Sequence, residues 1–358
     1  MTTETSSPAE ALATKVLLAG VGASEASNVY LGHKLGLYRA LAEVGPASSA
    51  RLAEAAGCDE RYVREWLQAQ AVTGFVTVDG TDPATAAFAL AEGGREVFVD
   101  ELSPFYLAPL GQAIAGVGAM LERLVAAFRS GEGVPYAAYP GGVSAQAALN
   151  RPAFANDLVS TWLPAIPGLA GRLATGARVA DFGCGSGWSS VELAKAYPRS
   201  TVDGYDADAE SIAAARANAE AAGVSDRVTF HQHDLAQPVQ DRYDVIFLFE
   251  CLHDFGYPQK VLTTVRGALA GDGTVVIMDE AVDETLVSPT DDPIQRFFAN
   301  VSPLWCLPQG RDTSDMDPVG TVMRPARLDA LAAASGFGPS QILGIEHPFF
   351  RFYQLSAA

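Results

Sequence analysis

The stretch from Val179 to Ser190, Val-Ala-Asp-Phe-Gly-Cys-Gly-Ser-Gly-Trp-Ser-Ser, carries glycines at three alternate positions. An apolar run from Val179 to Phe182 indicates a strand, and apolar residues at helical spacing follow until Pro198. The pattern predicts a strand that leads into a helix through a tight turn. Glycine permits such a turn and lets a ligand approach the backbone N–H groups at the start of the helix. We therefore expect a small polar ligand to bind at this turn.

The spacing of the glycines separates this turn from other ligand-binding loops. Its pattern is Asp181-x-Gly183-x-Gly185-x-Gly187, whereas a dinucleotide-binding turn has the pattern G-x-G-x-x-G. A phosphate-binding P-loop ends in Gly-Lys-Ser/Thr, and the first lysine after this turn is Lys195. A plain tight turn in an α/β fold would also fit, so the neighbouring residues must decide.

Acidic residues follow the next two predicted strands. Thr201–Tyr205 is followed by Asp206, which comes after the glycine turn at about the 20-residue spacing where an acid bonds ribose hydroxyls in nucleotide-binding α/β units. Arg227–His231 is followed by Asp234, whose carboxylate could accept a hydrogen bond from the exocyclic amine of adenine. These acids favour a nucleoside as the ligand.

The fourth predicted strand, Tyr243–Phe249, runs into a polar segment that contains Glu250, His253 and Asp254. Ligands of open α/β sheets bind beyond the carboxyl ends of the strands, so we expect this segment to face the same crevice as the glycine turn. A neutral histidine can take a proton near pH 7, with Asp279 or Asp254 fixing its tautomer. The alternatives are a structural hydrogen-bond donor for His253 and a solvated carboxylate for Glu250.

The cysteine and histidine pairs do not predict a metal site. Cys251-x-His253 and His231-x-His233 follow different strands and lack a third matched partner. The four cysteines include no C-x-x-C pair, which predicts neither a zinc cluster nor a disulfide framework and fits a reducing cytoplasm. We therefore expect no metal.

The composition is that of a globular protein with a large core, with 358 residues of which 49% are hydrophobic. The formal net charge of −18 opposes nucleic acid or an anionic membrane as the main partner, because phosphate binding needs a basic surface. The residues before the apolar stretch 16–23 include acids in place of a basic region, so a signal peptide is not expected. No stretch looks long and apolar enough to span a bilayer.

The N-terminal part predicts a winged helix after a flexible leader at residues 1–10. The predicted elements are two helices, Ser48–Ala56 and Glu60–Ala71, and two strands, Gly74–Val78 and Ala87–Leu90. Residues 1–100 hold 7 Lys or Arg against 13 Asp or Glu, a balance that would repel a DNA duplex. We interpret residues 11–102 as a winged-helix domain used for packing or dimerisation.

From Arg178 onward, predicted strands alternate with helices, which indicates a mostly parallel sheet with helices on both faces. A turn at Gly271–Gly273 precedes a fifth strand, and two more strands follow near the C-terminus. These three strands are Thr274–Met278, Gln341–Ile345 and Phe352–Leu355. The predicted fold class is α/β, a Rossmann-like, mostly parallel sheet of seven strands at residues 173–358, preceded by the winged helix and a helical linker at residues 103–172.

Asp181, the three glycines and the acids Asp206, Asp234 and Glu250 at successive strand ends together resemble the class I S-adenosylmethionine-dependent methyltransferases. Three upstream segments are similar to an actinobacterial-type subgroup of these enzymes that has an N-terminal winged helix, so the resemblance covers nearly the whole chain. They are Gly36-Leu37-Tyr38, Arg61-Tyr62-Val63-Arg64-Glu65-Trp66-Leu67 and Trp162-Leu163-Pro164-Ala165. Leu252-His253-Asp254-Phe255 is similar to the Leu-His-Asp-Trp segment of plant-type O-methyltransferases.

The resemblance implies that residues 173–358 bind S-adenosyl-L-methionine and release S-adenosyl-L-homocysteine. The glycine turn would hold the methionine moiety, Asp206 the ribose and Asp234 the adenine. The implied cofactor contacts are Asp181, Gly183, Gly185, Gly187, Trp188, Asp206, Ala207, Asp234, Leu235 and Glu250. His253 would be the general base and Asp279 would orient it. Glu250, counted with the catalytic residues, would bind the cofactor or the acceptor.

Aromatic residues outside the cofactor segment would line an apolar pocket for the acceptor, although plain core packing is an alternative. The candidates are Tyr136, Tyr139, Phe297, Phe298, Trp305 and Cys306. The predicted function is methyl transfer to a small, largely apolar acceptor, with an aromatic hydroxyl favoured, by a cytoplasmic homodimer joined through the N-terminal domain. The alternatives are C- or N-methylation of a natural-product intermediate in the same pocket and a ligand-sensing winged-helix transcriptional regulator.

Overall fold

A computed structural model of the chain describes residues 7–311 and 313–357, which form two compact units. The first unit extends to Gly118 and includes Pro140–Pro152. The second contains Ala119–Tyr139 and continues from Ala153. The predicted linker, residues 103–172, therefore contributes to both units.

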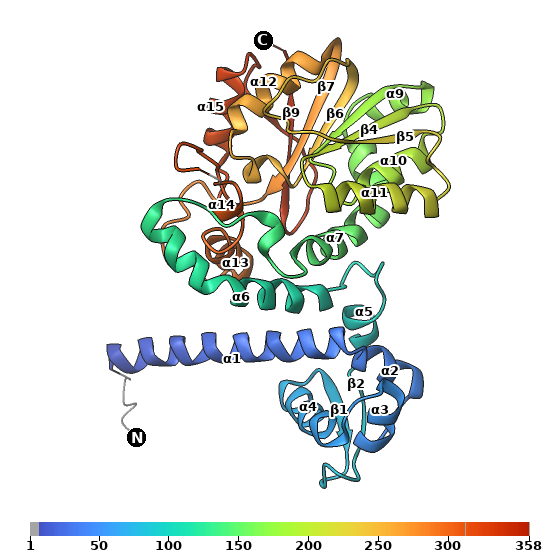
Figure 1. Ribbon diagram of the computed structural model, residues 1–358, viewed down its shortest axis with the longest axis vertical. Coiled ribbons are helices and arrows are strands. Elements are labelled where there is room, and N and C mark those ends of the chain that lie inside the picture. The colour runs from blue at the N-terminus through green and yellow to red at the C-terminus, as the bar shows by residue number, and fades with distance from the viewer. Residues whose placement is uncertain (1–6, 312, 358) are drawn as a thin grey trace. The chain divides into compact units, whose positions relative to one another are not determined.

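The first unit begins with a long helix that is followed by a small helical bundle (Figure 1). Its elements are α1 (Pro8–Lys34), α2 (Leu37–Val44), α3 (Ser49–Ala56), α4 (Glu60–Thr73), β1 (Val76–Asp79), β2 (Ala87–Leu90), α5 (Gly94–Phe98), the first part of α6 (Ala108–Ser130) and most of α7 (Gly142–Ala153). Ser7 and Glu10 start α1 with a capping box, in which each side chain accepts a hydrogen bond from the other residue's backbone N–H. Helix α1 thus begins inside the expected leader, of which residues 1–6 lie outside the described part.

Helices α3 and α4 and the hairpin β1–β2 form the expected winged helix. Gly57, at a φ of 64°, ends α3, and Asp59 starts α4 by accepting hydrogen bonds from two backbone N–H groups of its first turn. Strands β1 and β2 pair antiparallel and form the wing. Buried side chains from the helices and the wing, Leu52, Leu67 and Phe88 among them, share one core. The predicted winged helix is confirmed.

Helix α4 occupies the place of the helix that reads DNA in helix-turn-helix proteins. Its two arginines form ion pairs with glutamates one turn away on the same helix, Arg61 with Glu65 at 2.6 Å and Arg64 with Glu60 at 2.7 Å. These pairs offset the positive charge that contact with phosphates would need.

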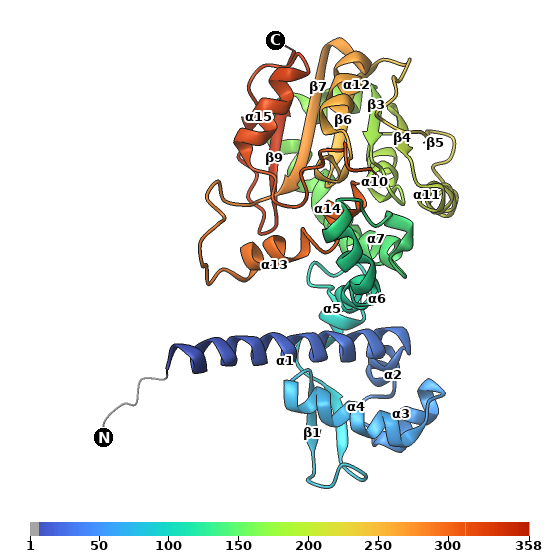
Figure 2. The same ribbon diagram turned by 60° about the vertical axis from the view of Figure 1, so that its left-hand side comes forward.

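The second unit is built on a sheet of seven strands with helices on both faces (Figures 1 and 2). The strands are β3 (Arg178–Phe182), β4 (Thr201–Asp206), β5 (Val228–Gln232), β6 (Tyr243–Phe249), β7 (Leu269–Glu280), β8 (Gln341–Ile342) and β9 (Phe350–Leu355). Their order across the sheet is β5-β4-β3-β6-β7-β9-β8, and only β9 runs antiparallel to its neighbours. The predicted mostly parallel, seven-stranded sheet is confirmed.

The helical elements of the second unit cover the sheet and connect its strands. They are the remainder of α6, η1 (Tyr136–Ala138), η2 (Phe154–Trp162), α8 (Leu163–Ala165), α9 (Leu169–Thr175), α10 (Trp188–Ala196), α11 (Ala209–Ala221), η3 (Leu252–Asp254), α12 (Pro258–Ala268), α13 (Pro293–Val301), α14 (Cys306–Gln309) and α15 (Pro325–Ala334). Alternate residues of β6 pack on opposite faces. Val245 and Phe247 share a core with residues of α10 and α11, while Ile246 and Leu248 share one with α12 and α15. Because both faces are covered, the strand is apolar from Val245 to Phe249.

The turn predicted at Gly271–Gly273 was wrong, because these residues lie inside β7. The register between β6 and β7 jumps from Tyr243 opposite Leu269 to Val245 opposite Thr274. The extra residues of β7 therefore form a bulge in the strand and do not precede it.

Helix α6 contains a long apolar stretch, and most of the residues in that stretch are not buried. By length and composition it could cross a membrane, so the expectation that no stretch is long and apolar enough was wrong. One such helix is weak evidence for a span, because core helices of globular proteins can have the same length and composition.

Candidate active site

The turn after β3 contains three glycines with positive φ, and their surroundings differ. A Cβ on Gly183 would lie 2.6 Å from Sγ of Cys251, and a Cβ on Gly187 would lie 2.6 Å from the ring of Phe230. A Cβ on Gly185, whose φ is 50°, would meet no heavy atom within 4 Å. Gly183 and Gly187 therefore permit close packing, whereas Gly185 presents its backbone to open space, where a ligand can approach.

Asp206 joins this turn to the ends of two more strands. Its Oδ2 accepts a hydrogen bond from the N–H of Gly185 at 2.9 Å, and its backbone carbonyl accepts one from the N–H of His233 at 2.8 Å. The predicted cofactor residues of β3, β4 and β5 thus meet at one edge of the sheet. Burial raises the pKa of Asp206 by more than the hydrogen bonds from Asp208 and Gly185 lower it.

Four other predicted cofactor residues lie around this edge. Trp188 begins α10 and packs partly buried against the core, and Leu235 is 2% exposed. Asp234 is exposed and accepts a hydrogen bond from the N–H of Ala236, and the carbonyl of the exposed Ala207 accepts one from Gln232. Their contact with the cofactor stays a prediction.

Asp181 is buried beneath the turn. Its Oδ2 accepts hydrogen bonds from the hydroxyls of Ser189 and Ser190, both at 2.6 Å. Because these serines lie in the first turn of α10, the carboxylate anchors the start of that helix against β3. The sequence predicted that Asp181 contacts the cofactor, and it did not predict that Asp181 anchors α10. The contact with the cofactor stays a prediction.

His253 lies in η3, directly after β6, and three carboxylates surround its ring. Nδ1 is 3.0 Å from Oδ1 of Asp279 and 3.0 Å from Oε2 of Glu280, and Nε2 is 3.1 Å from Oδ1 of Asp254. The thiol of Cys251, just before η3, donates a hydrogen bond to the carbonyl of Phe182 at the end of β3. The His253 cluster therefore adjoins the glycine turn, at the point where the strand order reverses between β3 and β6.

Burial alone would lower the pKa of His253, but the charges of Asp254, Glu280 and Asp279 outweigh it and raise this pKa well above its usual value. Burial raises the pKa of Glu280, and the charge of Asp279 adds to that rise. Asp279 is buried too, but the charge of His253 and the hydrogen bond between them lower its pKa. The three carboxylates therefore favour the charged form of the ring, which must lose its proton before His253 can act as a base.

Glu250 ends β6 in a strained conformation. Its φ is 52°, and no other described residue besides glycine has a positive φ. The left-handed region costs such a residue about 1 kcal/mol or more, and strain of this kind clusters at functional sites. Its N–H donates a hydrogen bond to the carbonyl of Met278 at 2.7 Å, which ties the ends of β6 and β7 together.

The segment at residues 133–139 is held to the segment that contains α14. The ring of Tyr139 stacks on Trp305 with centroids 5.1 Å apart, and its hydroxyl donates to the carbonyl of Leu304. The N–H of Val134 donates to the carbonyl of Pro308. Burial, followed by the charges of Asp254 and Asp206, raises the pKa of Tyr136.

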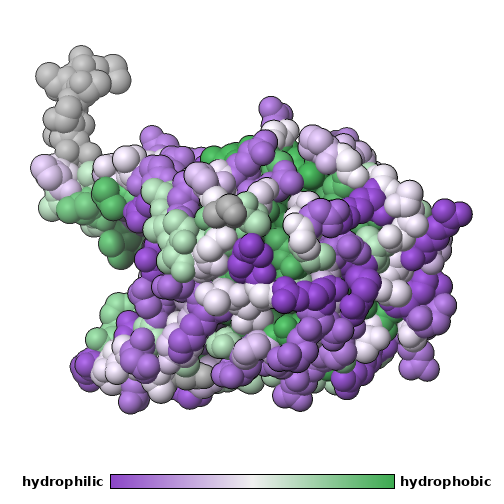
Figure 3. All heavy atoms as spheres, turned by 90° about the horizontal axis from the view of Figure 1, so that it is seen from above, coloured by the Kyte–Doolittle hydropathy of each residue, from purple (hydrophilic) through white to green (hydrophobic). Residues whose placement is uncertain are grey.

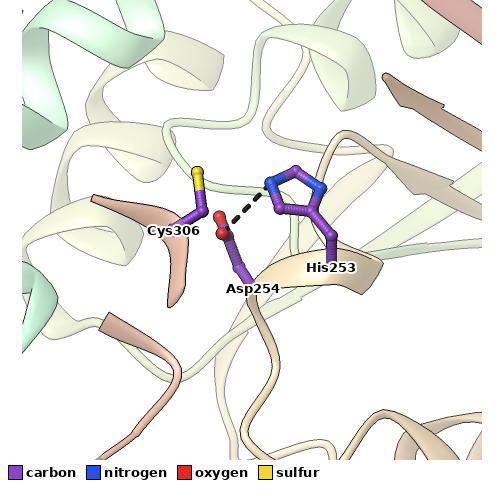
Figure 4. A group of neighbouring side chains, drawn as sticks. All are labelled: His253, Asp254 and Cys306. Atoms are coloured by element: carbon purple, nitrogen blue, oxygen red, sulfur yellow. Dashed lines mark ion pairs between the residues drawn. The ribbon is translucent and has the colours of Figure 1, made fainter. Parts of the chain in front are cut away.

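The other predicted pocket residues differ in exposure. Cys306 is partly exposed and lies near His253 and Asp254 (Figure 4). Burial of the thiol, followed by the charge of Asp254, raises its pKa to about 11, which argues against a nucleophilic thiolate. On α13, Phe298 is buried and Phe297 is 39% exposed. The structure thus places Cys306 beside His253 and Tyr139 against Trp305, and the acceptor pocket stays a prediction.

Comparisons with known proteins agree with this geometry. Residues 173–306 match the family described as methyltransferase domain, and residues 23–98 match the Rv2258c-like winged HTH domain. The solved structure of mitomycin 7-O-methyltransferase MmcR is similar with a TM-score of 0.72 at 20% identity, over 98% of this chain and 99% of that one. Human N-acetylserotonin methyltransferase in complex with SAM is similar with a TM-score of 0.72 at 16% identity, over the whole of both chains. At these identities the likeness shows the fold.

The curated relatives match a smaller part. Ribosomal protein L11 methyltransferase of Shigella sonnei is 33% identical over 141 residues, which cover 38% of this chain and 46% of that protein. The chain spans less than half the length of the curated relatives it matches, between 24% and 46%. The predicted combination of a methyltransferase domain and an N-terminal winged helix is confirmed.

Proposed function

We propose that this protein, a methyltransferase with an N-terminal winged helix by its two matched domains, transfers a methyl group from S-adenosyl-L-methionine to a small, largely apolar hydroxyl compound. The observation that carries the proposal is the hydrogen bond between Gly185 and Asp206 next to the His253 cluster, at the carboxyl edge of one sheet. A nucleoside and a proton acceptor are thereby provided for on adjacent strands.

The residues at this edge fit the cofactor. The carboxylate of Asp206 would accept hydrogen bonds from the ribose hydroxyls, and the open backbone at Gly185 would receive the methionine moiety. Asp234, exposed after β5, would accept a hydrogen bond from the adenine amine. When bound, S-adenosyl-L-methionine supplies an electrophilic methyl group. The complex of the similar human enzyme with SAM supports this assignment.

We infer that His253 is the general base for a hydroxyl acceptor. Asp279 at Nδ1 would keep the ring fixed with Nε2 directed outward, and the acceptor hydroxyl would take the position that the Asp254 carboxylate holds near Nε2. Methyl transfer depends mainly on holding the acceptor oxygen a little over ~3 Å from the methyl carbon. The stacked rings of Tyr139 and Trp305 would form part of an aromatic wall that favours an aromatic acceptor.

The direct test is calorimetric titration of the full chain with S-adenosyl-L-homocysteine. We expect saturable binding with one site per chain, and no detectable binding at millimolar ligand would overturn the proposal. Mass spectrometry of products formed from labelled cofactor with a panel of phenols and amines would identify the methylated atom. If only carbon or nitrogen atoms of the products are methylated, the acceptor is not a hydroxyl compound. A salt-dependent gel shift on genomic fragments would favour the alternative function of a winged-helix transcriptional regulator.

We also propose a homodimer formed through the N-terminal domain. Helix α1 exposes a run of large apolar side chains, and Figure 3 shows hydrophobic residues at its N-terminal end. The side chains are Leu12, Val16, Leu17 and Leu18, which are 62–73% exposed. A contiguous apolar surface of this kind marks an interface, and a second copy of the chain is the commonest partner. The four free cysteines suit the proposed cytoplasmic location.

A further inference from the structure

Three different ligand atoms converge beside the candidate active site. Nε2 of His253, a carboxylate oxygen of Asp254 and Sγ of Cys306 all lie within 4.8 Å of one another. Figure 4 shows the carboxylate of Asp254 between the imidazole and the Cys306 side chain. His253 and Asp254 come from η3 and Cys306 from the start of α14, so the tertiary structure assembles the group.

This set of donors matches one class of metal ion. Zinc is bound by imidazole nitrogen, thiolate sulfur and carboxylate oxygen, whereas calcium and magnesium need oxygen ligands throughout. The ligand atoms of a tetrahedral zinc ion lie about 3.3–3.8 Å apart. Nε2 and Oδ1 of Asp254 are 3.1 Å apart, and the sulfur of Cys306 lies within 4.8 Å of the ligand atoms of both residues.

The surroundings support the metal ligands in two further ways. Histidine ligands of metals characteristically donate their other ring N–H to a carboxylate, and Nδ1 of His253 lies 3.0 Å from Asp279. Oδ1 of Asp254 is buried and, within the described residues, meets no donor in hydrogen-bond geometry despite its closeness to Nε2. Asp254 is a partly exposed member of this cluster, whereas the second cluster, His253 with Asp279 and Glu280, is fully buried.

We propose that His253, Asp254 and Cys306 bind one Zn²⁺ ion, and that this ion competes with the acceptor for Nε2 of His253. Coordinate bonds form from Nε2, a carboxylate oxygen and the sulfur. The thiol proton, and any proton on Nε2, leave to solvent, and nothing is oxidised or reduced. The competition rests on the proposed function, while the binding of the ion stands without it. The sequence expectation of no metal considered Cys251-x-His253 and His231-x-His233, of which only His253 belongs to this set.

The test uses Co²⁺ as a spectroscopic probe on the full chain after treatment with a chelator. We expect one equivalent of Co²⁺ to give the intense visible bands of a tetrahedral site and a thiolate-to-cobalt charge-transfer band, both abolished by added Zn²⁺. Cys306→Ser should remove the charge-transfer band, and Asp254→Asn should weaken binding at least tenfold. Cys58→Ser, which changes a partly exposed cysteine of the first unit, should leave the spectrum unchanged.

Asp279→Asn provides a check that does not touch the ligands. It should weaken Co²⁺ binding about 10- to 100-fold, the usual effect of losing the partner of a histidine ligand. The proposal is overturned if saturating Co²⁺ gives no charge-transfer band, or if the band survives Cys306→Ser. Circular dichroism of each variant identifies any that fail to fold, and Cys306→Ser replaces only the thiol by a hydroxyl.

The competition has a separate readout. Zn²⁺ should lower turnover of the wild-type protein reversibly, with activity restored by a chelator, and Cys306→Ser should resist Zn²⁺ when compared with its own metal-free rate. Binding of S-adenosyl-L-homocysteine without a cobalt band would overturn the zinc site alone. A cobalt band without binding of S-adenosyl-L-homocysteine would overturn the proposed function and leave the zinc site standing.

Discussion

Oδ1 of Asp279 lies 3.0 Å from Nδ1 of His253, and the two side chains are only 1% and 2% exposed. Asp279 belongs to the end of β7 and His253 follows the end of β6, so the pair joins two neighbouring strands at the edge of the sheet where the candidate site lies. This buried contact helps to hold the imidazole in one orientation, and losing His253 would leave the Asp279 carboxylate without its buried cationic partner.

Replacement of the base should separate catalysis from cofactor binding. We expect His253→Ala to lower kcat about 10²- to 10⁴-fold, the usual contribution of a general base. Its affinity for S-adenosyl-L-homocysteine, measured by calorimetry, should stay close to that of the wild type. His231→Ala is the matched control, because His231 pairs with Asp203 between β4 and β5. Undiminished turnover in His253→Ala would remove its role as base.

The loss of Asp279 should be felt in stability as well as in rate. Asp279→Asn breaks a fully buried ion pair, and we expect the free energy of unfolding to fall by about 3–5 kcal/mol. Urea denaturation measures this change. The exposed pair of Asp317 with Arg327 is the control, because Asp317→Asn should change the free energy of unfolding by less than about 1 kcal/mol. If the two substitutions lower the free energy of unfolding equally, the buried pair of His253 with Asp279 does not make the larger contribution that we expect.

Cofactor affinity should depend on pH through Asp206. Burial raises the pKa of this carboxyl above its ordinary value of 3.8, and only the ionised form accepts hydrogen bonds with both oxygens. Affinity for S-adenosyl-L-homocysteine should therefore be highest above the raised pKa and fall as the pH is lowered through it. Asp206→Asn should bind about tenfold or more weakly and lose this dependence, whereas Asp203→Asn, on the same strand, should keep it. The same pH profile in wild type and Asp206→Asn would count against the assignment.

Two of the glycines should respond differently to a methyl group. Gly187→Ala would drive a Cβ into the ring of Phe230, so we expect a large loss of stability. Gly185→Ala meets open space and bears only the strain of its positive φ, about 1–2 kcal/mol, yet it should weaken cofactor binding more than it weakens the fold. Thermal denaturation and calorimetry together measure both effects. An unchanged affinity in a folded Gly185→Ala protein would move the ligand away from this turn.

The oligomeric state should depend on the exposed face of α1. Leu17, which is 67% exposed, makes no core contact that its loss would break, so Leu17→Glu should leave the fold intact and shift a dimer toward monomer. Analytical ultracentrifugation over a range of concentrations measures this shift. Val72→Glu is the control, because Val72 is 91% exposed on α4, away from α1 in the chain. A wild-type protein that is monomeric at high concentration would refute the dimer.

The strand-and-turn chemistry was predictable from local sequence. Local patterns in the sequence indicate the apolar strands β3 to β7, the glycine turn and the acids after β4 and β5. Such patterns depend only on the types and spacing of neighbouring residues. The boundary of β7 was missed because Gly271 and Gly273 favour a turn, whereas pairing with β6 absorbs them in a bulge. Tertiary hydrogen bonding overrode the local preference there.

The sequence by itself determined the fold class and predicted which edge of the sheet holds the candidate site and which histidine is the candidate base. The tertiary structure decided how the side chains at that edge are used. Alternation along a strand places Asp279 and Glu280 on opposite faces, yet at the end of β7 both reach Nδ1 of His253. Cys306, far along the chain, comes beside Nε2 only because α14 packs near η3. Such meetings depend on packing between distant segments, and no local period of the sequence encodes them.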